Sequence, residues 1–142
     1  LAWVDFSKTG LAPEDVADFR DRWMERAQGI ARDLGLTFRV DTASDPFFGR
    51  TAAMLAAGQL EMKLKYEILV PVVSEAKPTA VASFNFHQDH FGKHFDIETD
   101  DGEIANTACL GFGLERVVMA IFKTHGYDPK AWPAEIRARL WE

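Results

Sequence analysis

The sequence predicts an α+β fold, in which helices flank a mainly antiparallel sheet. Two apolar runs of strand-like composition, residues 66–73 and 79–86, are separated only by the short polar segment 74–78, which is typical of an antiparallel pair of strands. A long amphipathic helix is expected before this pair, and a shorter helix ending at Gly126 is expected after it. Hairpin-joined strands with helices inserted between some of them favour the α+β class.

The long helix begins at Pro13, because proline is preset for the first helical turn. Glu14 and Asp15 complement the positive end of the helix dipole, and Gly35 is typical of the position just past a helix end. Apolar residues recur at spacings of three and four, which predicts one buried face. That face consists of Val16, Phe19, Trp23, Ala27, Ile30 and Leu34.

The remaining elements follow from local composition. The alanine-rich segment 51–64 predicts a helix of weak periodicity, and residues 100–102 predict a tight turn between extended segments. The other expected elements are strands at residues 2–7 and 36–40, a loop at 45–49 and a final helix beginning at Pro133.

Composition places the chain among ordinary globular proteins of 142 residues, with 47% hydrophobic and 27% charged residues. The net charge of −6 argues against binding of nucleic acid through a broad, positively charged surface. The sequence has one cysteine, Cys109, which excludes an internal disulfide and favours a reducing compartment such as the cytoplasm. No apolar run has the length of a membrane span. Because the sequence begins at Leu1, within a segment of strand-like composition, we expect the chain to be the C-terminal part of a longer protein.

The most informative segment is residues 107–116, which runs into an apolar helix-like stretch. Gly111 and Gly113 allow close approach of the backbone to a flat or charged group, and Arg116 falls on the first turn of the following helix. Its guanidinium is a planar fork that suits phosphate oxygens. The pattern is neither a dinucleotide fingerprint nor a P-loop. An ordinary helix start with an exposed arginine is the alternative.

The order of elements resembles the C-terminal half of a class II aminoacyl-tRNA synthetase catalytic domain. Within that superfamily, the sequence is most similar to the amino acid:[carrier protein] ligases, which are stand-alone relatives of seryl-tRNA synthetase. The resemblance covers nearly the whole chain. It rests on residues 45–49, 83–87, 90–92, 107–126 and 131–133.

The resemblance implies that residues 1–142 are the C-terminal portion of a single catalytic domain that activates a small amino acid with ATP. Arg116 would hold the γ-phosphate, with Gly111 and Gly113 beside it. Glu67 would lie on the magnesium and ATP side, and Lys65 would steady a phosphate or a carboxylate. A solvent-facing strand position for Glu67 and a solvated lysine are the alternatives.

The resemblance also implies a zinc ion that holds the amino group of the substrate. Cys109 stands at the position of one ligand, and Asp5 stands where the family has a glutamate ligand. The remaining cysteine ligand would lie upstream of Leu1. Asn85 would help to hold the amino acid, and Phe48, beside Phe47, would line a purine or substrate pocket.

Structural alternatives to these roles are a buried thiol for Cys109, a backbone partner for Asn85 and simple packing for Phe48. His87, His90 and His94 have spacings that can converge on a metal, but Gly92 interrupts them, which favours a role in orienting loops.

The implied reaction forms an aminoacyl-adenylate from glycine or alanine and passes the aminoacyl group to the phosphopantetheine thiol of a small carrier protein. The resemblance further implies a cytoplasmic homodimer that requires Mg²⁺ and Zn²⁺. Because the chain is acidic and shows no basic patch, a carrier protein is favoured over tRNA as acceptor. A seryl-type tRNA synthetase and a non-catalytic binding module are the alternatives.

Overall fold

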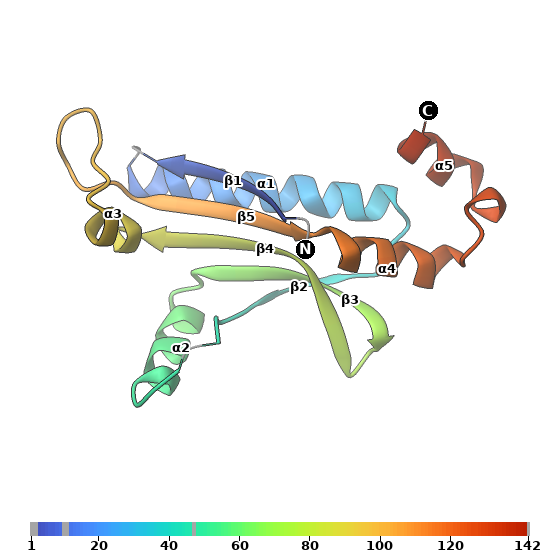
Figure 1. Cartoon of the computed structure of the whole chain (residues 1–142), viewed down its shortest axis with the longest axis horizontal. Coiled ribbons are helices and arrows are strands. Elements are labelled where there is room, and N and C mark those ends of the chain that lie inside the picture. Colours follow the sequence, from blue (N-terminus) through green and yellow to red (C-terminus); the bar gives the residue numbers. More distant parts are fainter. Residues whose placement is uncertain (1–2, 10–11, 47, 142) are drawn as a thin grey trace.

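The computed structural model describes residues 3–9, 12–46 and 48–141, with residues 3–9 described as backbone. Five strands form one sheet in the order β1-β5-β4-β3-β2, and every neighbouring pair is antiparallel (Figure 1). The predicted antiparallel sheet is therefore confirmed. The strands are β1 (Trp3–Thr9), β2 (Arg39–Thr42), β3 (Lys65–Ser74), β4 (Lys77–Gln88) and β5 (Thr107–Gly113).

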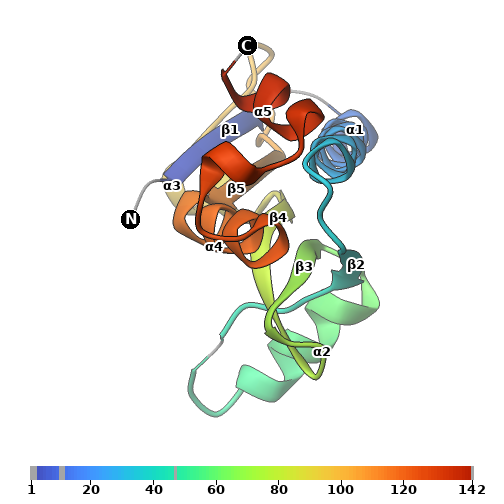
Figure 2. The same cartoon turned by 90° about the vertical axis from the view of Figure 1, so that its right-hand side faces the viewer.

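Helices α1 and α4 pack against the buried face of the sheet, and Figure 2 shows α1 nearly end on beside it. Phe84 on β4 and Leu110 on β5 are fully buried there, and Ala27 of α1 and Ala120 of α4 join the same core. The helices are α1 (Pro13–Asp33), α2 (Ala52–Glu61), α3 (His90–Phe95), α4 (Leu114–His125) and α5 (Ala134–Trp141), with a short 3₁₀ helix η1 (Pro129–Ala131).

The long helix α1 matches its predicted bounds, and Gly35 follows it with a positive φ of 67°. Its buried face differs from the prediction, because Ile30 is 47% exposed, whereas Ala31, which was not predicted, is buried. Arg20 is also buried, although it is charged. Its guanidinium donates to the carbonyl oxygen of Lys63 at 2.9 Å and lies over the ring of Tyr66. These contacts supply the partners that a buried cation requires.

Three elements were not predicted, namely β5, α3 and the 3₁₀ helix η1. The glycine-containing segment 107–113 lacks the alternation typical of a strand, so it was missed. Its backbone pairs with β1 on one side and with β4 on the other, and it therefore forms β5. The short helix α3 contains Gly92, where a β-carbon would collide with the carbonyl oxygen of Ala105. Gly92 therefore permits close packing of this helix rather than interrupting it. The predicted strand 36–40 begins later, at Arg39.

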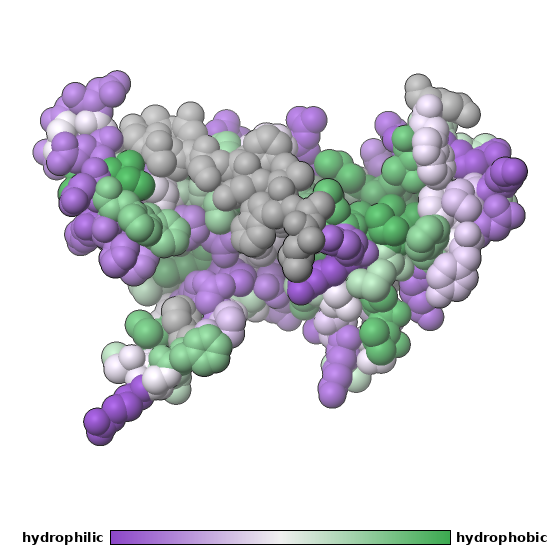
Figure 3. All heavy atoms as spheres, in the orientation of Figure 1, coloured by the Kyte–Doolittle hydropathy of each residue, from purple (hydrophilic) through white to green (hydrophobic). Residues whose placement is uncertain are grey.

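Helix α2 lies away from the two larger helices and has no buried residue (Figure 1). Its apolar side chains Met54 and Leu55 are 70% and 47% exposed. A second group of exposed apolar residues lies on α4, where green surface gathers in Figure 3. It consists of Leu114, Val118 and Met119. In the described ranges, no helix is both long and apolar enough to traverse a bilayer.

Candidate active site

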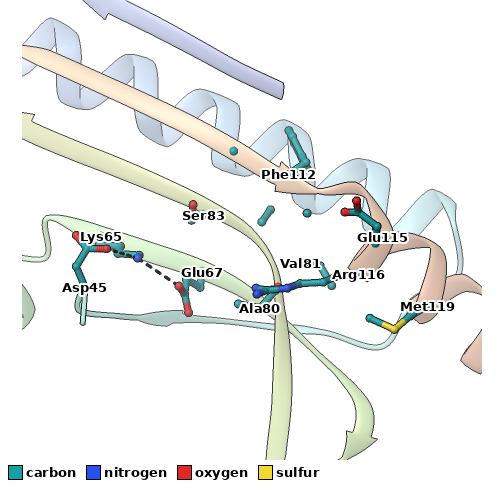
Figure 4. Close-up of a pocket in the computed structure, with 13 residues that line it drawn as sticks. Asp45, Lys65, Glu67, Ala80, Val81, Ser83, Phe112, Glu115, Arg116 and Met119 are labelled. Atoms are coloured by element: carbon teal, nitrogen blue, oxygen red, sulfur yellow. Dashed lines mark hydrogen bonds and ion pairs between the residues drawn. The ribbon is translucent and has the colours of Figure 1, made fainter. Parts of the chain in front are cut away.

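A pocket of about 640 Å³ lies between the sheet and the start of α4 (Figure 4). Glu67 on β3, Ser83 on β4 and Gly111 on β5 are register partners in one row across the sheet and line this pocket. The next row contains the buried Phe84 and Leu110. Because neighbouring rows point to opposite faces, the Glu67 row belongs to the face opposite the core. The described residues that line the pocket are Asp45, Lys65, Glu67, Ala80, Val81, Ala82, Ser83, Gly111, Phe112, Gly113, Glu115, Arg116 and Met119.

Arg116 extends from the first turn of α4 along the pocket. Its Nη1 donates to the carbonyl oxygen of Ala80 on β4 at 2.9 Å. The guanidinium is exposed and always charged, and it lies near the amino end of a helix, where the backbone dipole favours anions. This arrangement supplies a fixed positive charge for a phosphate or a carboxylate.

Glycine at position 113 makes room for this side chain. A β-carbon there would lie 3.1 Å from Cδ and 3.4 Å from Cγ of Arg116, which is closer than ordinary van der Waals contact. Gly113 is also the N-cap residue of α4. The pocket brings Gly111, Gly113 and Arg116 together, with both glycines in or at the end of a strand, while their predicted contact with ATP stays a prediction.

Lys65 lies at the far side of the pocket between two carboxylates. Its Nζ is 2.5 Å from Oδ1 of Asp45 and 3.5 Å from Oε1 of Glu67 (Figure 4). The Lys65 side chain is only 11% exposed, whereas those of Asp45 and Glu67 are 47% and 24% exposed. Lys65 therefore forms ion pairs with carboxylates of this chain and is not the solvated lysine of the alternative, while its contact with a phosphate or carboxylate of a substrate stays a prediction.

Asp45 is held from a second direction by helix α2. Its backbone N–H donates to Oε1 of Gln59 at 2.7 Å, and Nε2 of Gln59 donates to Oδ2 of Asp45 at 2.9 Å. Burial opposes ionisation of Asp45, but hydrogen bonds from Gln59 and Lys65, together with the charges of Lys65 and His87, outweigh it and lower the pKa of this carboxyl. Asp45 is thus an ionised carboxylate at neutral pH.

A further row of polar residues lies on the same face, beside the pocket. Lys65, Asn85 and Cys109 are register partners on β3, β4 and β5. Nδ2 of Asn85 donates to Sγ of Cys109 at 3.5 Å, and Nε2 of His87 lies 3.4 Å from the same sulfur. Nδ1 of His87 also lies 3.0 Å from Oγ1 of Thr107. The structure therefore brings Asn85 and Cys109 together and adds a histidine to them.

Asp5 can be placed only by its backbone. Asp5 is on β1, opposite Gly111 of β5, so it occupies a position diagonal to Cys109 on β5. Among the residues that the structure describes with side chains, no three histidine, cysteine, aspartate or glutamate residues are grouped so as to hold a metal ion. His90 and His94 stack on each other with ring centroids 6.1 Å apart.

Phe48 is not brought to the pocket. Its side chain is 88% exposed and is not among those that line the cavity. Phe47, its predicted neighbour in this role, lies outside the described residues. The aromatic loop at 45–49 instead contributes Asp45, the residue with which the segment begins.

Sequence reasoning missed Asp45 and His87 as parts of the site. Asp45 lies three residues after the end of β2, so a polar residue shortly after a strand was the available signal. His87 follows Asn85 by two positions, which would predict the same sheet face for both. The register of β4 against β5 shifts between Phe86 and Gln88, and a local irregularity of this kind has no sequence signature here.

Comparison with known proteins gives two groups of relatives. Amino acid–[acyl-carrier-protein] ligases 1 and 2 of Bradyrhizobium diazoefficiens are 58% and 54% identical to the chain over 125 and 127 residues, which are 88% and 89% of this chain and 38% of each relative. A type-2 serine–tRNA ligase of Methanopyrus kandleri is 29% identical over 140 residues, 92% of this chain and 26% of the relative. No protein-family model matches the chain.

Solved structures agree with the sequence comparison. The seryl-tRNA synthetase of M. kandleri, in complex with the A. aeolicus tRNASec, superposes with a TM-score of 0.76 and 27% identity over 97% of this chain and 27% of that one. The P. horikoshii seryl-tRNA synthetase complexed with ATP has a TM-score of 0.61 and 16% identity over 86% of this chain and 26% of that one, which supports the fold alone. The chain thus has the class II synthetase fold, and its sequence resembles a part of the seryl-tRNA synthetase-like ligases, spanning 38% of the length of the carrier-protein ligases that it matches.

Proposed function

We propose that the chain forms part of the active site of a ligase that activates a small amino acid, glycine or alanine, with ATP and transfers it to a carrier protein. The observation that carries this proposal is the pocket with Arg116 on one side and Glu67 on the other, on the sheet face opposite the core. The 58% identity to an amino acid–[acyl-carrier-protein] ligase supports the choice of reaction. Residues 1–142 would then be the C-terminal portion of one catalytic domain.

In the proposed first step, an oxygen of the amino acid carboxylate attacks the α-phosphorus of ATP, and the bond from that phosphorus to the bridging oxygen of pyrophosphate breaks. Arg116 neutralises the terminal phosphates, and Glu67 offers carboxylate oxygens to the divalent cation that accompanies ATP. A cation bound there would spread the negative charge of the triphosphate. Alignment and charge neutralisation suffice for this step, so it requires no nucleophilic side chain.

In the proposed second step, the phosphopantetheine thiol of the carrier attacks the carbonyl carbon of the aminoacyl-adenylate. The thiol loses its proton, AMP leaves and an aminoacyl thioester is formed. Asn85, on the row next to the pocket, would contact the amino acid. The role of Phe48 in substrate binding remains a proposal that requires its loop to approach the pocket, since its side chain is 88% exposed.

A zinc ion would hold the substrate amine through Cys109 and Asp5. A thiolate suits zinc, and the diagonal positions of the two residues on β1 and β5 fit a shared ligand set. Among the residues described with side chains, which include Cys109 but not Asp5, no three-ligand group is found. We therefore assign no reaction step to zinc.

The acceptor distinguishes this proposal from its main alternative. The net charge of −6 favours a phosphopantetheine-bearing carrier over tRNA, whereas the similarity to type-2 serine–tRNA ligases favours a synthetase. The test supplies the complete protein with ATP, radiolabelled glycine, alanine or serine, and either holo-carrier or bulk tRNA. Label on holo-carrier, and none on apo-carrier lacking the prosthetic group, supports the ligase. Label on tRNA with none on holo-carrier would establish the synthetase, and no ATP-dependent product would favour a non-catalytic module.

We further propose that the complete protein is a cytoplasmic homodimer. The exposed apolar residues on α4 support an interface, because apolar side chains grouped on a surface mark contact sites. Sedimentation velocity tests this proposal, and a monomer at micromolar concentration would contradict it.

A further inference from the structure

The geometry at Lys65 presents a competition between two carboxylates for one ammonium group. Lys65 Nζ lies 2.5 Å from Asp45 but 3.5 Å from Glu67, so the closer ion pair is with Asp45. Lys65 and Glu67 are two residues apart on β3 and both line the pocket. If the Asp45 carboxylate were removed, Glu67 would be the one of these two carboxylates left to pair with the ammonium group.

Asp45 is well suited to hold the lysine, because its own position is fixed. Gln59 of α2 forms one hydrogen bond with the backbone N–H of Asp45 and another with its Oδ2, which leaves Oδ1 directed at Lys65. Hydrogen bonds and nearby positive charges also lower the pKa of this carboxyl despite its burial. The carboxylate therefore stays charged and oriented throughout the neutral pH range.

We propose that Asp45 is a positioning residue that draws Lys65 away from Glu67 and so keeps the Glu67 carboxylate available to a divalent cation. The inference rests on the proposed function, in which Glu67 serves the cation of ATP. Magnesium prefers carboxylate oxygens as ligands, and an ammonium group in close contact with Glu67 would compete with it for the same lone pairs. Lys65 then acts through Glu67 and not on a phosphate.

The decisive variant is Asp45→Asn in the complete protein, because the amide has the size of the carboxylate and keeps hydrogen-bonding capacity toward Gln59. We expect the Mg²⁺ concentration that half-saturates pyrophosphate exchange to rise about three- to tenfold. Binding of Mn²⁺ in the presence of a non-hydrolysable ATP analogue, followed by electron paramagnetic resonance, should weaken by the same factor. Asp41→Asn is the matched control, since Asp41 on β2 lies opposite Glu67 of β3 but does not line the pocket. It should change neither value by more than about twofold.

A rescue experiment separates this role from a purely structural one. If an ion pair between Lys65 and Glu67 weakens cation binding in Asp45→Asn, then adding Lys65→Met to that variant should restore Mn²⁺ binding to within about twofold of wild type. Unchanged Mn²⁺ binding in Asp45→Asn, or weak binding that Lys65→Met does not restore, would overturn the inference while leaving the ligase intact. A wild-type protein without Mg²⁺-dependent exchange would instead reject the proposed function. Circular dichroism confirms that each variant is folded.

Discussion

The guanidinium of Arg116 donates a hydrogen bond to the carbonyl oxygen of Ala80 at 2.9 Å, which joins the first turn of α4 to a strand 36 residues earlier in the chain. This bond directs the arginine along the pocket, while Gly113 leaves space for its aliphatic part. Two segments, residues 113–116 and the part of β4 around Ala80, therefore set the position of one positive charge.

Arg116→Ala in the complete protein should reduce adenylate formation strongly, because it removes a fixed electrostatic donor to the triphosphate. The expected loss is about 2 to 4 kcal/mol of transition-state stabilisation, measured as amino-acid-dependent pyrophosphate exchange. Lys123→Ala is the control, since Lys123 is a cation in the last turn of the same helix and does not line the pocket. Exchange within twofold of wild type for Arg116→Ala would remove this residue from the site.

Cys109→Ser in the complete protein should remove most of its zinc while the fold survives, because the proposed metal serves the substrate amine more than the core. The wild type should contain about one zinc per chain, since catalytic zinc sites use three protein ligands. Elemental analysis beside circular dichroism measures both properties. His94→Ala is the control. The ring of His94 stacks on His90, and the proposed zinc site does not include it, so this variant should keep its zinc. Full zinc content in Cys109→Ser, or none in the wild type after expression with added zinc, contradicts the assignment.

Asp45 should contribute stability that depends on pH in a defined direction. Its folded-state pKa lies below the ordinary value of 3.8, so its contribution is fully present above that value and is lost as the pH falls through the folded pKa. The difference in unfolding free energy between wild type and Asp45→Asn should be largest at neutral pH and should shrink below the ordinary value. Because the side chain is 47% exposed, the difference should stay under about 1 kcal/mol. Denaturant titrations at several pH values measure it, and a difference that grows toward low pH would refute the sign.

Gly92→Ala should destabilise the protein by about 1 to 3 kcal/mol, because the new methyl group would enter the space of Ala105 and lie 2.8 Å from Cγ2 of Ile104. Gly29→Ala is the matched control in the interior of α1, where a β-carbon would meet nothing within 4 Å. It should be neutral or stabilise by up to about 1 kcal/mol. Thermal unfolding of both variants tests the contrast, and equal effects would show that packing at α3 does not constrain position 92.

The sequence by itself determined the elements whose signals are local. Pro13, the acidic first turn and Gly35 delimit α1 through backbone geometry and dipole effects that act within a few residues. The β3–β4 pair and the helix that carries Arg116 were predicted for the same reason. The phosphate-binding role of Arg116 and the zinc-binding role of Cys109 stay predictions, which the residue types suggest because a guanidinium and a thiol have few chemical uses.

Only the tertiary structure decided which of these groups meet. The pairing of Lys65 with Asp45 spans 20 residues, and the contact of Arg116 with Ala80 spans 36. Sheet register and helix packing set such distances, and neither has a local sequence signal. Ile30 and Arg20 illustrate the same limit, since helical periodicity predicts a buried face but the neighbouring elements decide its edges. The register of β4 against β5 shifts between Phe86 and Gln88, and the pairing of these strands brings the His87 ring beside Cys109, 22 residues later in the chain.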